Sequence, residues 1–185
     1  MKTSLRNKLA GRIRIRAASV LVAPLFALSV SAMLPSALSA SPKPPMADRI
    51  VVHKKDRIME LLDNGQVFET YKIALGGQPL GAKTREGDHR TPEGVYVIDR
   101  RNAHSRYHRA LHVSYPNAAD RERARALGVS PGGDIFIHGL PNGYGWIGSA
   151  HRDRDWTDGC IAVTDQEIEE IWRLVPDGTP VEIRP

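Results

Sequence analysis

The sequence predicts a mainly β domain with a few short helices, and three observations support this. Glycine and proline are both abundant, with 16 and 13 residues, which favours many turns. Short apolar runs alternate with turn residues along most of the chain. Two segments alone have a convincing helical pattern. The length of 185 residues, with 41% hydrophobic and 25% charged residues, is that of a globular chain with one domain.

The first 40 residues are predicted to be a secretory signal peptide rather than part of the fold. They begin with a basic segment without acids, continue with an apolar run at 17–34, and end in small residues. Cleavage is expected after Ala32 or near Ala40. Retention as an N-terminal anchor is the alternative, although Pro24 and several serines weaken the run as a membrane helix. We therefore expect export to the periplasm or cell envelope.

The net charge of +5 depends on this leader. Without its six basic residues, 20 Lys and Arg stand against 21 Asp and Glu, so the mature charge is about −1. Arg121, Arg123 and Arg125 alternate with acids or alanines, as on a solvated helix face. The basic precursor therefore gives no indication of nucleic-acid binding.

The elements of the domain follow a proline-rich linker at 41–47. Strands are expected within 48–55 and at 58–63, 67–75, 95–99, 111–115, 134–138 and 180–183, with a short apolar segment at 160–163. The turn Asp63-Asn64-Gly65 joins the second and third strands. Loops are expected at 76–92 and 139–158, and a polar connection at 99–109. Helices are expected at 120–127, stopped by Gly128, and at 165–174, where Thr164 and Glu167 form a capping box.

The segment 135–163, IFIHGLPNGYGWIGSAHRDRDWTDGCIAV, carries the candidate chemistry. It holds the only cysteine of the chain, Cys160, and a histidine, His138, that closes a short apolar run. A single cysteine in an exported protein is buried and inert, paired between chains, or a reactive thiol. A thiolate is a nucleophile, and an imidazole can take the thiol proton. We expect Cys160 and His138 to meet and to perform acyl transfer, with Gly159 and Gly139 allowing close approach of backbone.

These residues give the chain a resemblance to the L,D-transpeptidase catalytic domain, the YkuD-like family of cysteine enzymes that remodel bacterial peptidoglycan. The likeness runs from about residue 49 to 183 and includes GDHRTPEGVYVI, LHVSYPN, IHG and TDGCIAV. The family signature is His-Gly, a loop of somewhat under twenty residues, and Ser/Thr-His-Gly-Cys. The matching positions here are His138, Thr157, Gly159 and Cys160. Asp158 replaces the family histidine, Ala162 replaces a polar residue or arginine, and the loop is slightly long.

The resemblance implies a β-sandwich or barrel over residues 48–185. It also implies that the Cys160 thiolate attacks the amide between meso-diaminopimelate and the terminal D-alanine of a peptidoglycan tetrapeptide stem, so that D-alanine leaves and a thioester forms. An amine then takes the acyl group: diaminopimelate of another stem, an envelope lipoprotein, or a D-amino acid. A hydrolase of the same fold, cutting stem peptides or lipoprotein links, and an inactive wall-binding module remain alternatives. Carbapenem-type inhibitors are expected to acylate Cys160, and no cofactor is expected.

The central roles follow from acyl-transfer chemistry. His138 is expected to be the base toward the thiol and later the acid toward the leaving amine. The carbonyl of Gly139, or Leu140, is expected to orient the imidazole. Backbone N–H groups of Gly159 and Cys160 are the expected donors to the oxyanion.

Further residues are candidates for binding substrate, each with a structural alternative. Asp158, beside Thr157, is expected to bind an acceptor amine or pair with an arginine, or else to be a turn residue. Arg152 and Arg154 suit a D-alanine carboxylate, or else form loop salt bridges with Asp153 or Asp155. Trp146, Tyr144 and Trp156 wall the cleft or pin the loop on the core. His112 and Tyr115 line the cleft, because the family places that strand there, or pack in the core. No metal site is expected, although His104, His108 and His112 are spaced by four.

Overall fold

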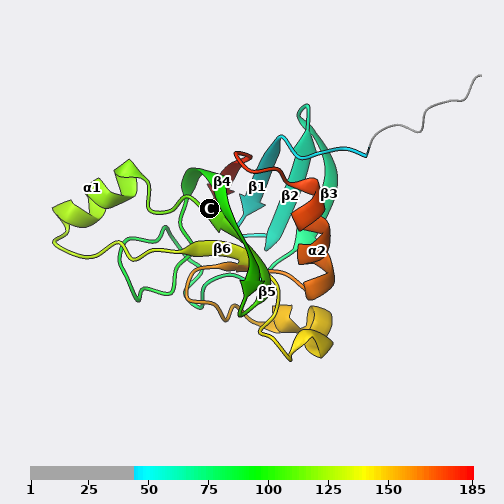
Figure 1. Ribbon diagram of the computed structural model, residues 1–185. Helices are drawn as coiled ribbons and strands as arrows, with labels where there is room; N and C mark the ends of the chain where they lie inside the picture. Colours follow the sequence, from blue (N-terminus) through cyan, green and yellow to red (C-terminus); the bar gives the residue numbers. More distant parts are fainter. Residues whose placement is uncertain (1–43) are drawn as a thin grey trace, which may run out of the picture. The chain divides into compact units, whose positions relative to one another are not determined.

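The computed structural model describes residues 44–185 (Figure 1). The leader expected at 1–40 and the first part of the expected linker lie outside the described residues. The elements in chain order are β1 (Arg49–His53), β2 (Ile58–Asp63), β3 (Gln66–Lys72), β4 (Gly94–Ser105), β5 (His108–Val113), α1 (Ala118–Ala126), β6 (Ile135–His138), the 3-10 helix η1 (Gly145–Asp153), β7 (Ile161–Ala162), α2 (Asp165–Leu174) and β8 (Pro180–Arg184). The domain is mainly β, as the sequence predicts. No helix within residues 44–185 is long and apolar enough to cross a membrane.

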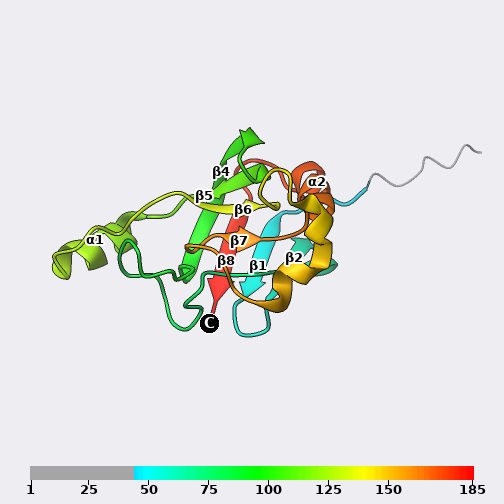
Figure 2. The same cartoon turned by 90° about the horizontal axis from the view of Figure 1, so that it is seen from below.

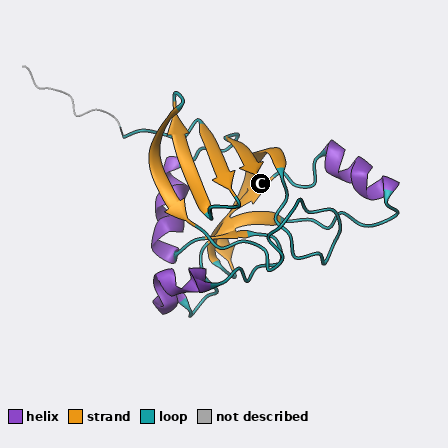
Figure 3. Cartoon of the chain, turned by 180° about the vertical axis from the view of Figure 1, so that it is seen from behind, coloured by secondary structure: helices purple, strands orange, loops and turns teal. Residues whose placement is uncertain are grey.

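The eight strands form one sheet in the order β3-β2-β1-β8-β4-β5-β6-β7. Strand β4 joins its two halves, because its first part pairs with β8 and its later part with β5. A register shift between Ile98 and Arg100 lies at this change of partner, where a bulge allows the strand to bend. Figures 2 and 3 show the two halves lying at an angle to one another.

The two ends of the sheet also meet. Ala74, just after β3, exchanges both backbone hydrogen bonds with Ala162 of β7, at 3.0 and 2.9 Å. The sheet therefore curls around one apolar core, and the β-sandwich or barrel expectation is confirmed. Ile50, Leu111 and Ile161, from three separate strands, are fully buried in this core.

The two α-helices have different relations to the core. Helix α2 buries Ile168 and Ile171 against the sheet, and Thr164 and Glu167 form the capping box that the sequence predicts. Helix α1 lies away from the sheet (Figures 1 and 3), and it buries Asp120 and Ala124. Asp120 closes a second capping box at the start of α1, so local hydrogen bonds rather than a large apolar face define this helix.

Two expectations for the connections are wrong. The polar connection expected at 99–109 is the second half of β4, a tight turn at residues 106–107 and the start of β5. Most side chains in this half of β4 are exposed, so no alternation of apolar residues marks it as a strand. The loop expected at 139–158 contains η1, which is interrupted at Gly148 by a positive φ of 52°.

The 76–92 loop, by contrast, is held firmly against the sheet. Lys54 is 2% exposed, and its ammonium donates to the carbonyl oxygens of Gly81 and Thr91 and to the Glu93 carboxylate. A buried ammonium that uses all three donors fixes the position of the loop around it. The loop is thereby fixed beside the turn that carries Cys160.

Candidate active site

A cavity of about 380 Å³ opens on the sheet where β5, β6 and β7 lie side by side. His138 and Cys160 both line it, together with Ala110 and Phe136 of the neighbouring strands. The β4–β5 turn region, including Tyr107, forms another wall. The fold therefore brings His138 and Cys160, which are 22 positions apart in the sequence, into one cleft.

The strand register explains why these two side chains face the same cleft. Strands β6 and β7 run parallel, with Ile137 opposite Ile161 and His138 opposite Ala162 (Figure 2). Side chains alternate between faces along a strand, so His138 and Cys160 lie on the same face of adjacent strands. The N–H of Phe136 lies 3.4 Å from the Cys160 sulfur, consistent with this register.

His138 is held as a neutral base. Its Nδ1 lies 2.7 Å from the Gly139 carbonyl oxygen, which can only accept, so Nδ1 carries the proton and Nε2 keeps a lone pair. The Tyr107 and Trp156 rings lie 4.5 and 5.9 Å from the imidazole, centroid to centroid. His138 is 4% exposed, and burial lowers its pKa to about 4. The imidazole is therefore free to take a proton at neutral pH.

Cys160 rests as a thiol. Burial raises its pKa, the carboxylates of Asp158 and Asp134 raise it further, and the N–H of Phe136 acts in the opposite direction. The sulfur also lies 3.7 Å from the Asp134 carbonyl oxygen, to which the S–H can donate. The effects that raise the pKa outweigh those that lower it, so the thiol is the form of Cys160 at neutral pH.

Asp134 contacts Cys160, and the sequence analysis missed this contact. It has a φ of 49°, a strained value for a residue with a side chain. Arg100 donates to its carboxylate at 3.1 Å, and His112 Nε2 lies 3.4 Å from the same oxygen. His112 in turn bonds Asp99 through Nδ1. The sequence does contain a signal for this position, because Asp134 follows two glycines directly before strand β6.

His112 shares the face of the sheet with His138 and Cys160, because it lies opposite Phe136 in the β5–β6 register. It is 8% exposed and packs edge-on against the Phe136 ring at 5.0 Å. It does not line the 380 Å³ cavity. Its expected place in the cleft is therefore corrected to a place behind it, beside Asp134, where the buried His112 Nε2 forms no hydrogen bond within residues 44–185.

The turn before Cys160 is fixed by Thr157. The Thr157 hydroxyl donates to the Cys160 carbonyl oxygen at 2.7 Å and accepts the Gly159 N–H at 3.1 Å. Gly159 has a φ of 130°, and a Cβ there would lie 2.6 Å from the Arg90 carbonyl oxygen. Only glycine fits this position.

The backbone donors differ from those expected. The Gly159 N–H is occupied by Thr157, and the Gly139 N–H donates to the Arg109 carbonyl oxygen at 3.3 Å. Neither is free for an oxyanion in this structure. The Cys160 N–H has no acceptor among the hydrogen bonds found within residues 44–185, so it is the donor that remains.

Asp158 stands at the rim of the cleft with 91% of its side chain exposed. It pairs with His89 at 2.8 Å, rather than with an arginine. His89 belongs to the GDHRTPEG segment. The spacing of residues along the sequence does not indicate that this segment folds beside the Cys160 turn.

Four other expected cleft residues lie elsewhere. Tyr115 is 3% exposed and donates to the Pro131 carbonyl oxygen at 2.8 Å, so it belongs to the core. Arg152 is bonded to Glu167 of α2, and Arg154 lines a separate cavity. Trp146 is 81% exposed and does not line the cleft. Within residues 44–185, no group of three or more His, Cys, Asp or Glu is arranged to hold a metal ion.

Comparisons with known proteins identify the family of this chain. The model of the YkuD family, the L,D-transpeptidase catalytic domain, matches residues 47–183. A protein of Escherichia coli described as the putative L,D-transpeptidase YafK is 33% identical over 132 residues, covering 68% of this chain and 46% of that protein. This chain therefore spans about half the length of the curated relatives that it matches.

Solved structures give the same result. The helical cell shape determining protein Pgp2 of Campylobacter jejuni superimposes with a TM-score of 0.57 at 29% identity, over 73% of this chain and 46% of that one. Bd1075 of Bdellovibrio bacteriovorus shares the fold, with a TM-score of 0.52 at 23% identity over 75% and 48% of the two chains. The family match covers nearly all described residues and includes the cleft with Cys160 and His138. The chain belongs to the L,D-transpeptidase catalytic domain family.

Proposed function

We propose that this protein is an exported cysteine L,D-transpeptidase that acts on the tetrapeptide stems of peptidoglycan in the periplasm. The observation that carries the proposal is the pairing of a neutral, buried imidazole with the one thiol of the chain in a single open cleft. This chain is similar to YafK, described as a putative L,D-transpeptidase, and to Pgp2, described as a cell shape determining protein. Both similarities support peptidoglycan as the substrate.

The first half of the reaction releases D-alanine. His138 Nε2 takes the proton of the Cys160 thiol as the sulfur attacks the carbonyl carbon of diaminopimelate, so that a C–S bond forms. The oxyanion accepts a hydrogen bond from the Cys160 N–H. The tetrahedral intermediate collapses, the C–N bond breaks, and His138 returns its proton to the leaving D-alanine amine. A thioester on Cys160 remains.

The second half transfers the acyl group. An amine from a second stem, a lipoprotein or a D-amino acid attacks the thioester, and His138 takes its proton. The C–S bond then breaks, and the sulfur regains a proton from His138. Water as the acceptor would give hydrolysis by the same steps.

The direct test is the product profile from a purified tetrapeptide stem, with and without a D-amino acid as acceptor. We expect release of D-alanine and, with the acceptor, a product in which the D-amino acid has replaced it. Cys160→Ser should abolish both products while keeping the circular dichroism spectrum of the fold. Release of D-alanine with no exchange product identifies a hydrolase. Absence of turnover and of carbapenem acylation at Cys160 would identify an inactive wall-binding module.

A further inference from the structure

A second cavity, of about 630 Å³, lies beside the catalytic cleft. Its walls come from the segment between β6 and Trp156, and we name it the η1 cavity after the 3-10 helix that forms much of it. Apolar side chains make most of the wall, namely Leu140, Pro141, Tyr144, Ile147 and Trp156. The catalytic mechanism uses none of this space.

Trp156 separates the η1 cavity from the catalytic base. Its ring lies 5.9 Å from the His138 ring and 6.4 Å from the His151 ring, centroid to centroid. His151 and Trp156 both line the η1 cavity. A ligand in this cavity is therefore one side chain away from the reaction.

The cavity wall contains a polar group without a partner. His151 is 7% exposed, and its Nδ1 accepts the Trp156 indole N–H at 3.4 Å, so the proton of the neutral ring is on Nε2. Burial lowers the pKa of His151, which favours that neutral ring. The Nε2 atom is buried and has no hydrogen-bond partner within residues 44–185. A buried donor without an acceptor is unfavourable, and a carbonyl group on a ligand would satisfy it once the ring turns this atom toward the cavity.

The charges at the cavity favour a neutral ligand. Asp153 and Arg154 both line it and have opposite signs. An anionic or cationic ligand would be attracted by one of them and repelled by the other. Hydroxyl and amide groups can bond both.

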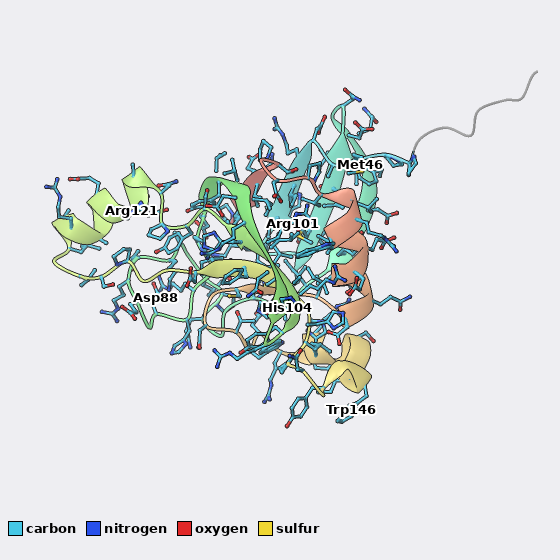
Figure 4. All side chains as sticks on the ribbon, in the orientation of Figure 1. Met46, Asp88, Arg101, His104, Arg121 and Trp146 are labelled. Atoms are coloured by element: carbon cyan, nitrogen blue, oxygen red, sulfur yellow. The ribbon has the colours of Figure 1, made fainter. Side chains whose placement is uncertain are left out.

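Two exposed aromatic rings belong to the same segment. Tyr144 lines the η1 cavity and is 54% exposed, and Trp146 is 81% exposed and projects from the end of the domain that carries η1 (Figure 4). Exposed apolar surface beside a cavity is typical of binding sites. Their flat faces match the C–H faces of sugar rings.

The length of the proposed substrate places a sugar near this position. The attacked bond follows the third residue of the stem, and the stem is attached to the glycan through its first residue. Three extended residues span about 10 Å, so the glycan must pass within that reach of Cys160.

We propose that the η1 cavity and the exposed rings of Tyr144 and Trp146 bind the N-acetylated glycan that carries the stem peptide. The acetamido carbonyl accepts the His151 N–H, and the sugar ring stacks on the aromatic faces. This inference rests on the proposed function for the identity of the polymer. Glycan binding at this position makes the enzyme prefer stem peptides that are attached to the glycan over free stem peptides.

The test uses two substrates and one binding probe. Rates are compared for a free tetrapeptide and for the same tetrapeptide attached to its disaccharide, in wild type, Tyr144→Ala and Trp146→Ala. Chitotriose binding is followed by tryptophan fluorescence. Leu80→Ala, which removes another exposed apolar side chain (82% exposed), is the matched control. We expect each aromatic variant to lose about 3- to 10-fold in kcat/KM on the disaccharide substrate, with no change on the free peptide and weaker chitotriose binding.

Other outcomes are equally informative. Equal losses on both substrates, or no saturable response to chitotriose, overturn the proposal while the turnover itself upholds the transpeptidase function. Loss of binding to phospholipid vesicles in Trp146→Ala, without a chitotriose response, would assign the rings to a membrane surface instead and also overturns it. Chitotriose binding that depends on Tyr144, without turnover of either substrate, retains the sugar site and rejects the transpeptidase function.

Discussion

The wild-type protein is expected to lose stability as the pH falls from 6.5 to 4. Replacing His138 by glutamine is expected to abolish this pH dependence. Burial lowers the pKa of His138 from 6.5 to about 4. As the pH falls below 6.5, the imidazole binds a proton in the unfolded chain but stays neutral in the folded one. Protonation therefore stabilises the unfolded state, and the free energy of unfolding falls until the folded imidazole also titrates.

The magnitude follows from the two pKa values. Each pH unit in this window costs about 1.4 kcal/mol, so the total is about 3 kcal/mol, with no contribution above pH 6.5 and no further loss below 4. This is a large part of the stability of a domain of this size. Since the side chain is almost fully buried, solvent screens little of the effect.

Urea denaturation followed by circular dichroism, in steps from pH 7.5 to 4, measures this quantity. His151 has a lowered pKa for the same reason, so the difference between wild type and His138→Gln isolates His138. His104→Gln, which removes an exposed imidazole, is the matched control and should keep the wild-type pH dependence. A difference between wild type and His138→Gln that stays constant over the whole range would refute the view that burial holds this base neutral.

Three further substitutions test the surroundings of the nucleophile. Gly159→Ala forces a Cβ to 2.6 Å from the Arg90 carbonyl oxygen at a φ of 130°, so unfolding measurements should show a loss of about 2 kcal/mol or more. Thr157→Val removes both bonds of a buried hydroxyl and should cost about 1–3 kcal/mol; an unchanged urea midpoint would contradict this role. Arg100→Ala removes the side chain that donates to the Asp134 carboxylate and should slow carbapenem acylation of Cys160 about 10-fold. Acylation at the wild-type rate would show that the position of Asp134 does not depend on this donor.

The elements with strong local signals were predictable from the sequence. Strand β2 and helix α2 have the predicted limits, because alternation, a tight turn and a capping box are encoded within a few residues. The second half of β4 was not predictable in this way. Its side chains are mostly exposed, and its strand geometry depends on pairing with β5.

The cleft residues, too, were predictable only in part. Cys160 and His138 were identifiable as candidate reactive groups beside glycines, and the β6–β7 register explains how they come to line the same cleft. Asp134 and His89 were missed because their contacts with the Cys160 turn join segments far apart in the chain. Tyr115 and Trp146 were assigned to the cleft, but chemistry alone could not decide whether an aromatic ring lies in the core, in the cleft or on the surface.

The most direct test of the paired action of Cys160 and His138 is the mass of the protein after reaction with a tetrapeptide stem and quenching in acid. Wild type should gain the mass of the stem without D-alanine, and peptide mapping should place it on Cys160. His138→Gln should form this adduct at least about 100-fold more slowly at pH 7. An adduct that forms at the wild-type rate in His138→Gln, or one attached to any other residue, would contradict the account.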